Sequence, residues 1–431
     1  MITGIFNSKT NIIILILWIV GFFHFNLLPN FLTHYSDNIL FLVVFFIIVC
    51  SFLEKKMALP KGKFEKNINR AMFLLLVFAV INCLVCNYYR HQPVYKTFVQ
   101  WTPILFIFFY YPFRKVKLRT NDWERIIYIL FCIVIVIEIV MLLFPHLLLF
   151  QMTSGTEKFK NELRVRVFAD GILFLGNTMC LNKALVGEKR IKYGILYVFS
   201  LFLIFMTGFR MLDVACVIVF FYLLYKLKLL RIKQLLIATV ILVLSLIGIM
   251  QIPTVKDRIE EMTERSQVDN FSNDDYIRVL LFNYYTTEYF KSNMEFFLGS
   301  GMVQRIVLTD EMRSIKSTDY PSKYSKEVSF MSNQFHYFPV DMGLIGLSWE
   351  AGIPAVLIIL FVLFYMVRKK TPPQYYYISA WALFLILISW NNPKVYHHHN
   401  MIYLPIVLVI LEKVMCKETE SQKVEINDRN N

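Results

Sequence analysis

Residues 71–87 read AMFLLLVFAVINCLVCN, an apolar block without one charged side chain. Similar blocks recur along the chain, at roughly the 17 to 25 residues that a helix needs to cross the hydrocarbon core of a bilayer. None of them alternates apolar and polar residues as a strand does, and an open sheet edge is not tolerated in lipid. The sequence therefore predicts an all-α, polytopic integral membrane protein.

The composition agrees with this class. The chain has 431 residues, of which 57% are hydrophobic, with 40 Phe and a mean hydropathy of +0.53. In a soluble protein, the net charge of +14 would suggest a nucleic-acid partner. Here Lys and Arg cluster in short loops between the apolar blocks, as cytoplasmic topology signals do. We therefore expect membrane lipid, and no nucleic acid, as a partner.

The seven cysteines are expected to be free thiols. Nearly all lie inside apolar blocks, and the polar segment 253–338 has none, which argues against a disulfide framework and a zinc ribbon. Cys83 and Cys86 have the spacing of a redox pair, but two buried apolar thiols are the favoured interpretation. The segment 1–23 carries only Lys9 and no clear cleavage site, so it is interpreted as a first span and not as a signal peptide.

About twelve spans are predicted, and they divide the chain into four parts. Residues 1–252 hold spans one to nine, 253–338 form a large outer loop, 339–416 hold spans ten to twelve, and 417–431 form a tail. The predicted spans lie at 12–29, 37–53, 71–87, 97–113, 126–149, 167–185, 192–208, 211–226, 234–252, 339–367, 375–391 and 400–416.

The basic loops set the orientation. Threading the spans from a cytoplasmic N-terminus puts nearly all of these loops on one side, as the positive-inside rule requires. They are 54–70, 114–125, 183–192, 226–233, 368–370 and the tail after Lys413. The short loops on the opposite side are poor in Lys and Arg, except at 157–166, and a loop as long as 253–338 is exempt from the rule. Both termini are therefore expected in the cytoplasm, with the large loop outside.

The outer loop is too long to be a plain connection, so we expect a folded functional element. Segments 254–257 and 272–275 fit the capping-box pattern that opens a helix. After the second of these, apolar residues repeat at helical spacing and predict one amphipathic helix to about Phe297. Gly299 and Gly301 then predict a sharp turn.

Four arginines are predicted at or near the outer surface. Arg164 and Arg166 precede the sixth span, Arg210 lies between the seventh and eighth, and Arg278 lies in the outer helix. A single arginine there is explained by snorkelling to water, or for Arg210 by pairing with Asp213. Several arginines on separate elements favour an anion site, because the guanidinium is always charged and its planar fork fits phosphate oxygens.

His336 and Asp341 lie where the outer loop returns to the membrane. A histidine at this boundary can titrate near neutral pH and act as a general base, and Asp341 could orient it or be the base itself. The plainer alternative is a solvated surface histidine. The run 397–399 is not expected to bind metal, because adjacent helical side chains point about 100° apart. Glu138, in mid-span, is given no role.

Four segments in the second half of the chain form an ordered set of motifs. They are RVRVFADGILFLGNTMCLNKAL (164–185), TGFRMLDVA (207–215), RVLLFNYYTTEYFKSNMEFFLGSGM (278–302) and HYFPVDMGLIGLSWEAGIP (336–354). In this order, with the large loop outside, they resemble the bacterial O-antigen polymerase and ligase superfamily of membrane glycosyltransferases. The corresponding family patterns are R-x-x-x-x-G, T-x-S-R-g, R…l-l-G-x-G and H/D…G-l-i-g…e-x-G-i. Phe209 stands where the family usually has a small residue.

The resemblance implies transfer of an oligosaccharide from undecaprenyl diphosphate to a sugar hydroxyl, at the periplasmic face of the bacterial inner membrane. Arg210 and Arg278, supported by Arg166, would hold the leaving diphosphate. His336, or else Asp341, would accept the proton of the acceptor hydroxyl. No metal and no other cofactor are implied, because the arginines take the electrostatic role. A chain-length regulator protein is implied as a further partner.

The favoured activity is the polymerisation of lipid-linked repeat units of O-antigen, capsule or exopolysaccharide. A ligase would use the same chemistry with the lipid A core as acceptor, and polymerase is favoured because the match is diffuse. A flippase for lipid-linked oligosaccharides would show pseudo-symmetric halves, which the sequence lacks. A metal-dependent transferase would need an acidic pair in its first outer loop, where 24–37 offers only Asp37.

Overall fold

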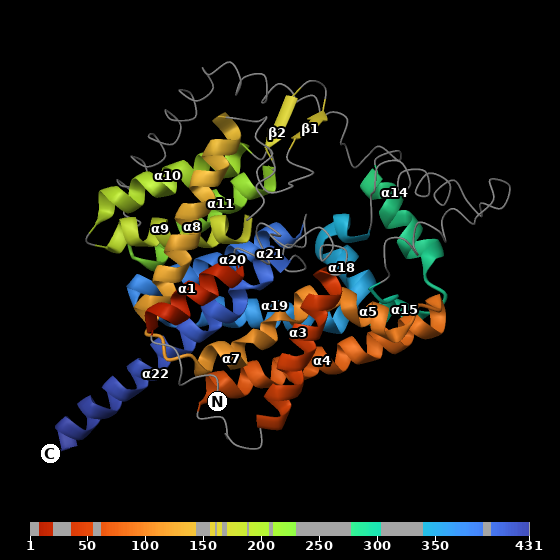
Figure 1. The fold of residues 1–431 in the computed structure, drawn as a ribbon, viewed down its shortest axis with the longest axis horizontal. Coiled ribbons are helices and arrows are strands. Elements are labelled where there is room, and N and C mark those ends of the chain that lie inside the picture. Colours follow the sequence, from red (N-terminus) through yellow and green to blue (C-terminus); the bar gives the residue numbers. More distant parts are fainter. Residues whose placement is uncertain are drawn as a thin grey trace.

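The described part of the chain is helical, as the all-α prediction requires, with one short hairpin in addition. The computed structural model describes residues 8–19, 36–54, 62–143, 156–159, 162–165, 170–187, 189–206, 210–229, 277–302, 339–390 and 398–430 (Figure 1). Strands β1 (Thr156–Phe159) and β2 (Glu162–Val165) pair antiparallel, with Glu157 opposite Arg164. This hairpin lies in the basic segment before the sixth predicted span.

Helices occupy most of the predicted spans. The unbroken ones are α1 (Ser8–Ile19), α3 (Ser36–Glu54), α4 (Lys63–Arg90), α8 (Thr120–Leu143), α9 (Asp170–Val186), α10 (Arg190–Met206), α11 (Arg210–Lys226) and α20 (Tyr376–Ser389, after the turn η8, Pro373–Tyr375). The chain ends in α21 (His398–Met401) and α22 (Tyr403–Asn430). The predicted ninth span, 234–252, lies outside the described residues.

Three predicted spans are broken where the sequence predicted continuous helices, and one of them, 400–416, breaks at Ile402 between α21 and α22. The segment 97–113 consists of α5 (Val94–Gln100), α6 (Thr102–Leu105), the 3-10 turn η4 (Phe106–Phe109) and α7 (Tyr110–Lys115). The segment 339–367 consists of the turn η7 (Pro339–Met342), α18 (Gly343–Ala351) and α19 (Ile353–Arg368). Pro103 opens α6, and Gly352 separates α18 from α19 with a φ of 90° that no helix adopts.

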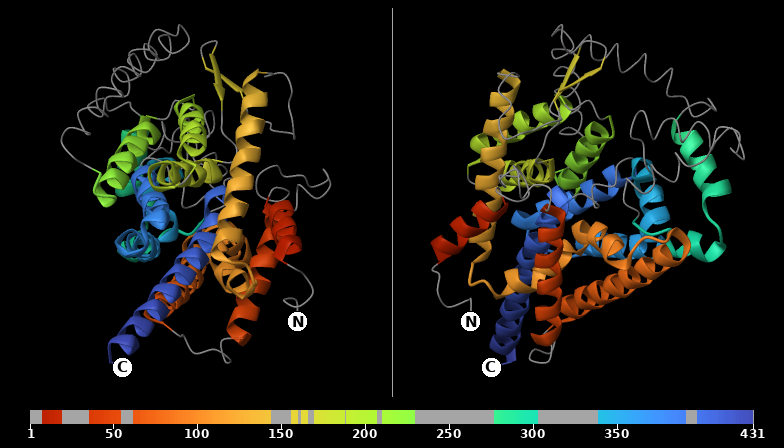
Figure 2. Two further views of the ribbon diagram at one scale, coloured as in Figure 1. Left: turned by 90° about the vertical axis from the view of Figure 1, so that its left-hand side faces the viewer. Right: turned by 45° about the vertical axis from the view of Figure 1, so that its right-hand side comes forward.

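The helices share one large hydrophobic core. Helix α9 packs against α8, α10 and α20, and α19 packs against α4 and α20. Figure 1 shows α9, α10 and α11 together on one side, with α4 running along the opposite edge. Figure 2 shows α22 extending away from the body of the molecule at its C-terminal end.

One helix of the described part has the length and composition needed to cross a membrane. This is α4, whose most apolar window has a mean hydropathy of 2.2. Four other apolar helical stretches of the described residues are shorter, at 10–17 residues, and they lie at 9–19, 38–50, 171–186 and 353–368.

Segments that the sequence predicts on the cytoplasmic side contact one another. Arg114, in the second basic loop, forms ion pairs with Glu65 of the first loop and, at 2.8 Å, with Glu412 of α22. Lys183, in the third loop, forms an ion pair at 2.8 Å with Glu124 of the second. These contacts bring together one end each of α4, α7, α8 and α9, and they join α7 to α22 at Glu412.

Candidate functional site

The predicted site residues fall on separate elements, and the structure describes them to different extents. Arg166 and His336 lie outside the described residues. Arg210 begins α11 and Asp341 lies in η7, but their side chains are not among those described. Arg278 is half-buried near the start of α14 (Ile277–Tyr284), and α14 packs against η7. The element that carries Arg278 therefore lies beside the turn that contains Asp341.

The start of α11, which carries Arg210, lies toward the end of α20. Lys226, the last residue of α11, donates a hydrogen bond at 2.8 Å to Ser379 near the start of α20, and the two helices pack extensively. They therefore run in opposite directions, and Arg210 lies toward the end of α20. There the backbone of Trp390 lies against Gly343, the first residue of α18.

The outer helix predicted up to Phe297 is interrupted. After α14 the chain forms a wider π turn, η6 (Tyr285–Tyr289), and Phe290 is extended before α15 (Asn293–Leu298) begins. Ser292 caps α15 by accepting a hydrogen bond from the backbone N–H of Glu295 at 3.1 Å. The spacing Ser-x-x-Glu is a capping-box signal. The sequence contains this signal, but the helical spacing of the apolar residues upstream predicts a helix that continues through Ser292.

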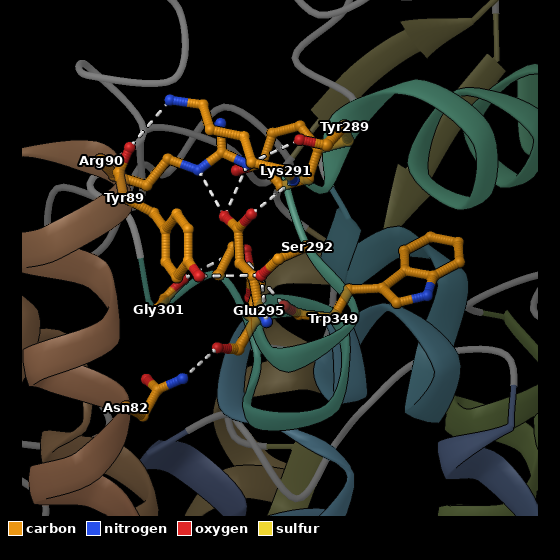
Figure 3. Close-up of polar contacts among 11 residues, drawn as sticks. Asn82, Tyr89, Arg90, Tyr289, Lys291, Ser292, Glu295, Gly301 and Trp349 are labelled. Atoms are coloured by element: carbon orange, nitrogen blue, oxygen red, sulfur yellow. Dashed lines mark hydrogen bonds and ion pairs between the residues drawn. The ribbon is translucent and has the colours of Figure 1, made fainter.

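A group of polar side chains, which we call the outer clasp, fastens this segment to the end of α4 (Figure 3). At its centre Glu295 is fully buried and forms an ion pair with Arg90 at 2.8 Å. The Arg90 guanidinium also donates to the carbonyl of Tyr289 at 2.8 Å and lies 3.9 Å from the centre of that ring. The backbone N–H of Lys291 donates to the second oxygen of Glu295 at 2.7 Å. Because both charged groups are buried, removing either one would leave the other as an unpaired buried charge, which is strongly destabilising.

The remaining members of the outer clasp add hydrogen bonds between the same two segments. Ser292 donates its hydroxyl proton to the hydroxyl oxygen of Tyr89 at 2.9 Å, and the Lys291 ammonium donates to the Tyr89 carbonyl at 3.0 Å. The outer clasp thus comprises Tyr89, Arg90, Tyr289, Lys291, Ser292 and Glu295.

The glycine turn that follows α15 joins two of the motif segments. Gly299 and Gly301 have φ values of 83° and 95°, a region that favours glycine. The backbone N–H of Ser300 donates to the Trp349 carbonyl at 2.8 Å, and that of Gly301 donates to the Glu350 carbonyl at 3.1 Å. A side chain at Gly301 would overlap Cys86 of α4. The turn is therefore held tightly between α4 and α18.

Asn82 of α4 ties this turn to the helices beneath it. Its amide donates to the carbonyl of Leu298 at 2.8 Å and to that of Glu350 at 2.9 Å. Its carbonyl oxygen accepts from the indole of Trp101 at 2.9 Å. A polar residue in an apolar block thus satisfies one backbone carbonyl of α15 and one of α18.

Aromatic side chains pack together at α14 and the π turn that follows it. Trp349 is buried and stacks on Tyr285 with ring centres 5.1 Å apart, and exposed Phe282 lies 6.1 Å from Trp349. Burial raises the pKa of the Tyr285 phenol well above its ordinary value, so this group stays neutral. Phe282 is four residues after Arg278, so both lie on one face of α14. This arrangement places a cation beside an aromatic surface.

The described residues contain no group of three or more His, Cys, Asp or Glu side chains placed to hold a metal ion. Among these residues, the chemistry available around α14 is the binding of an anion by Arg278 and of an apolar ring face by Phe282. Comparison of the chain with models of known protein families gave no match, and neither did comparison with curated proteins. A functional assignment therefore rests on the residues and their geometry.

Proposed function

We propose that this protein is a membrane glycosyltransferase that polymerises lipid-linked oligosaccharide repeat units, with undecaprenyl diphosphate as the leaving group. In this proposal the chain crosses the bacterial inner membrane about twelve times. Both termini face the cytoplasm, and the loop 253–338 faces the periplasm together with the site.

The observation that carries the proposal is the junction between two motif segments. Segments 278–302 and 336–354 both resemble motifs of the O-antigen polymerase and ligase superfamily. Backbone hydrogen bonds join Ser300 to Trp349 and Gly301 to Glu350, although about 49 residues separate each pair. Chance resemblances at unrelated positions would have no reason to meet. Their contact supports treating both segments as parts of one site.

Charge distribution supports the orientation. The basic loops assigned to the cytoplasm meet through Arg114 and Lys183, and the outer clasp lies at the opposite end of α4. Helix α4 runs from Lys63 to Arg90 and has the hydropathy of a span. A single helix thus connects the two predicted faces, with several ion pairs near its start and the pair between Arg90 and Glu295 at its end.

The reaction follows from the charges. The oxygen of an acceptor sugar hydroxyl attacks the anomeric carbon of the lipid-linked oligosaccharide, and the new glycosidic bond forms. The bond from that carbon to the diphosphate oxygen breaks, and its electron pair leaves with the diphosphate. Arg210 and Arg278, with Arg166 in support, stabilise the developing negative charge. His336 or Asp341 accepts the hydroxyl proton.

The test replaces Arg210, Arg278 or His336 separately by Ala in the bacterium that makes the glycan. Each variant should shorten or abolish the ladder of surface glycan on a gel, and leave single repeats attached to the core. Free core with accumulated lipid-linked glycan would instead identify a ligase. Normal ladders from all three variants would reject this site.

Matched variants separate charge from geometry. Arg278→Lys keeps the charge but loses the fork, so it should retain only part of the activity. Arg119→Ala removes an arginine whose side chain is 90% exposed in a predicted cytoplasmic loop, and it should leave the ladder unchanged. Blotting for the membrane-inserted protein excludes loss of expression as the cause.

A further inference from the structure

Helix α15 has its polarity reversed relative to a helix on the surface of a water-soluble domain. Its one charged residue, Glu295, is 0% exposed. By contrast, Met294, Phe296 and Phe297 are 58%, 39% and 52% exposed. These three large apolar side chains lie on a helix of six residues and form an exposed patch that requires an apolar partner.

The patch lies at the same level along α4 as exposed apolar residues of that helix, but on the opposite side, because α15 contacts Asn82 and Arg90. Val80, Leu84 and Tyr88, at helical spacing toward the outer end of α4, are 45%, 57% and 74% exposed. The outer clasp binds α15 to the residues that follow directly, through the ion pair between Arg90 and Glu295. At this level of the predicted span, apolar side chains are therefore exposed on two sides, on α4 and, across it, on α15.

We propose that α15 is immersed in the outer leaflet, where phospholipid acyl chains cover Met294, Phe296 and Phe297. This inference rests on the bilayer-spanning part of the proposed function, but it does not depend on glycan transfer. Burying Glu295 against Arg90 removes the one charge that would oppose insertion, and apolar side chains then lie at the boundary of the acyl chains, as in interfacial helices. With α15 anchored there, α14 and its Arg278 are held at the height of the lipid headgroups.

Lipid fits this patch better than a second protein does. The exposed residues of α4 repeat along the helix from Phe73 to Tyr88 and so require lipid along their whole length if α4 spans the bilayer. Because α15 binds the face of α4 opposite to Leu84, apolar side chains are exposed on two sides at one level, which a surrounding bilayer covers and a single bound protein does not.

The experiment places the photoreactive p-benzoylphenylalanine at single positions of the full chain, reconstituted in liposomes of phosphatidylethanolamine and phosphatidylglycerol with radiolabelled acyl chains. Its ring resembles phenylalanine, so replacing Phe297 perturbs little. After illumination, lipid cross-linked to the protein band is counted. Position 84 serves as the reference inside the predicted span, and the exposed Thr287 of η6 serves as the polar control.

We expect cross-linking at position 297 to be comparable to that at 84 and several-fold above that at 287. Lipid capture at 84 without capture at 297 would overturn the inference while leaving the bilayer proposal intact. Capture at neither position would overturn the membrane placement itself. Capture at 297 of a second protein copy, in place of lipid, would also overturn the inference. If the variant at 297 does not insert, Met294 offers the same test.

Discussion

The ion pair between Arg90 and Glu295 shows what the sequence leaves out at the scale of single residues. The two residues are separated by 205 positions and belong to different predicted parts of the molecule. Each lies in a predicted outer loop, where a solvated side chain is the default interpretation. Only the folded chain reveals that both are buried, with side chains 7% and 0% exposed.

Breaking this pair should destabilise the protein strongly. Arg90→Ala leaves the buried Glu295 carboxylate without its cation, and the expected loss is about 3–5 kcal/mol in the free energy of unfolding. Replacing both residues by apolar ones, Arg90→Met with Glu295→Leu, should cost much less than the two single changes together. Thermal unfolding of the protein purified in detergent measures this. Additive losses would show that the residues do not act as a pair.

Glycine positions offer a second residue-scale comparison. Gly301→Ala should destabilise the protein by about 1–3 kcal/mol and shorten the glycan ladder, because its φ is 95° and its new side chain would overlap Cys86. Gly194→Ala is the matched control. Gly194 lies inside α10 with nothing within 4 Å of an added side chain, so the change should be neutral or stabilising by up to about 1 kcal/mol. Equal effects at both positions would contradict a tightly held turn.

At the scale of elements, hydropathy predicted where the helices lie but not where they break. The apolar blocks that contain α3, α8 and α20 are continuous, and so are these helices. The breaks at Gly352 and around Pro103 depend on what packs nearby. At Gly352, for example, a side chain would meet the carbonyl of Leu298 from the outer loop. The hydropathy of one segment contains no information about a neighbour from another part of the chain.

The cap of α15 gives a prediction at this scale. Ser292→Ala removes the acceptor for the N–H of Glu295 and the donor to Tyr89, and it should cost about 1 kcal/mol. Hydrogen exchange should quicken at the amides of 293–298, while Ser292→Thr keeps the hydroxyl and should preserve protection. Ser348→Ala removes only a bond back to Ile345 within α18, so it should leave α15 unaffected. Unchanged exchange in Ser292→Ala would contradict the cap.

At the scale of the whole molecule, the class of fold follows from composition, because apolar content and helical length are summed over many residues. The number of spans does not follow as firmly, since one helix of the described part meets the criteria by length and composition. The candidate site is less predictable still. The arginines could be named from the chain, but their grouping depends on the packing of α14 against η7 and on where the start of α11 lies.

Topology can be tested with cysteine labelling. Cys416 is an exposed thiol on the predicted cytoplasmic side, and Lys291 is exposed on the predicted outer side. In spheroplasts, a membrane-impermeant maleimide should label Lys291→Cys at once, while Cys416 should react only after permeabilisation. The parent chain without the added cysteine provides the background. Labelling in the reverse order would invert the proposed orientation.

The contact between Arg114 and α22 has a consequence for how the protein is made. Glu65 and Arg114 leave the ribosome well before Glu412, which binds Arg114 and accepts a hydrogen bond from Tyr110, 302 positions earlier in the chain. Until Glu412 has been synthesised, Arg114 has one carboxylate in place of two, and the Tyr110 hydroxyl lacks this acceptor. A prematurely terminated chain would therefore carry an unfinished polar junction that full-length molecules lack, which gives proteolytic surveillance a local feature by which to distinguish them.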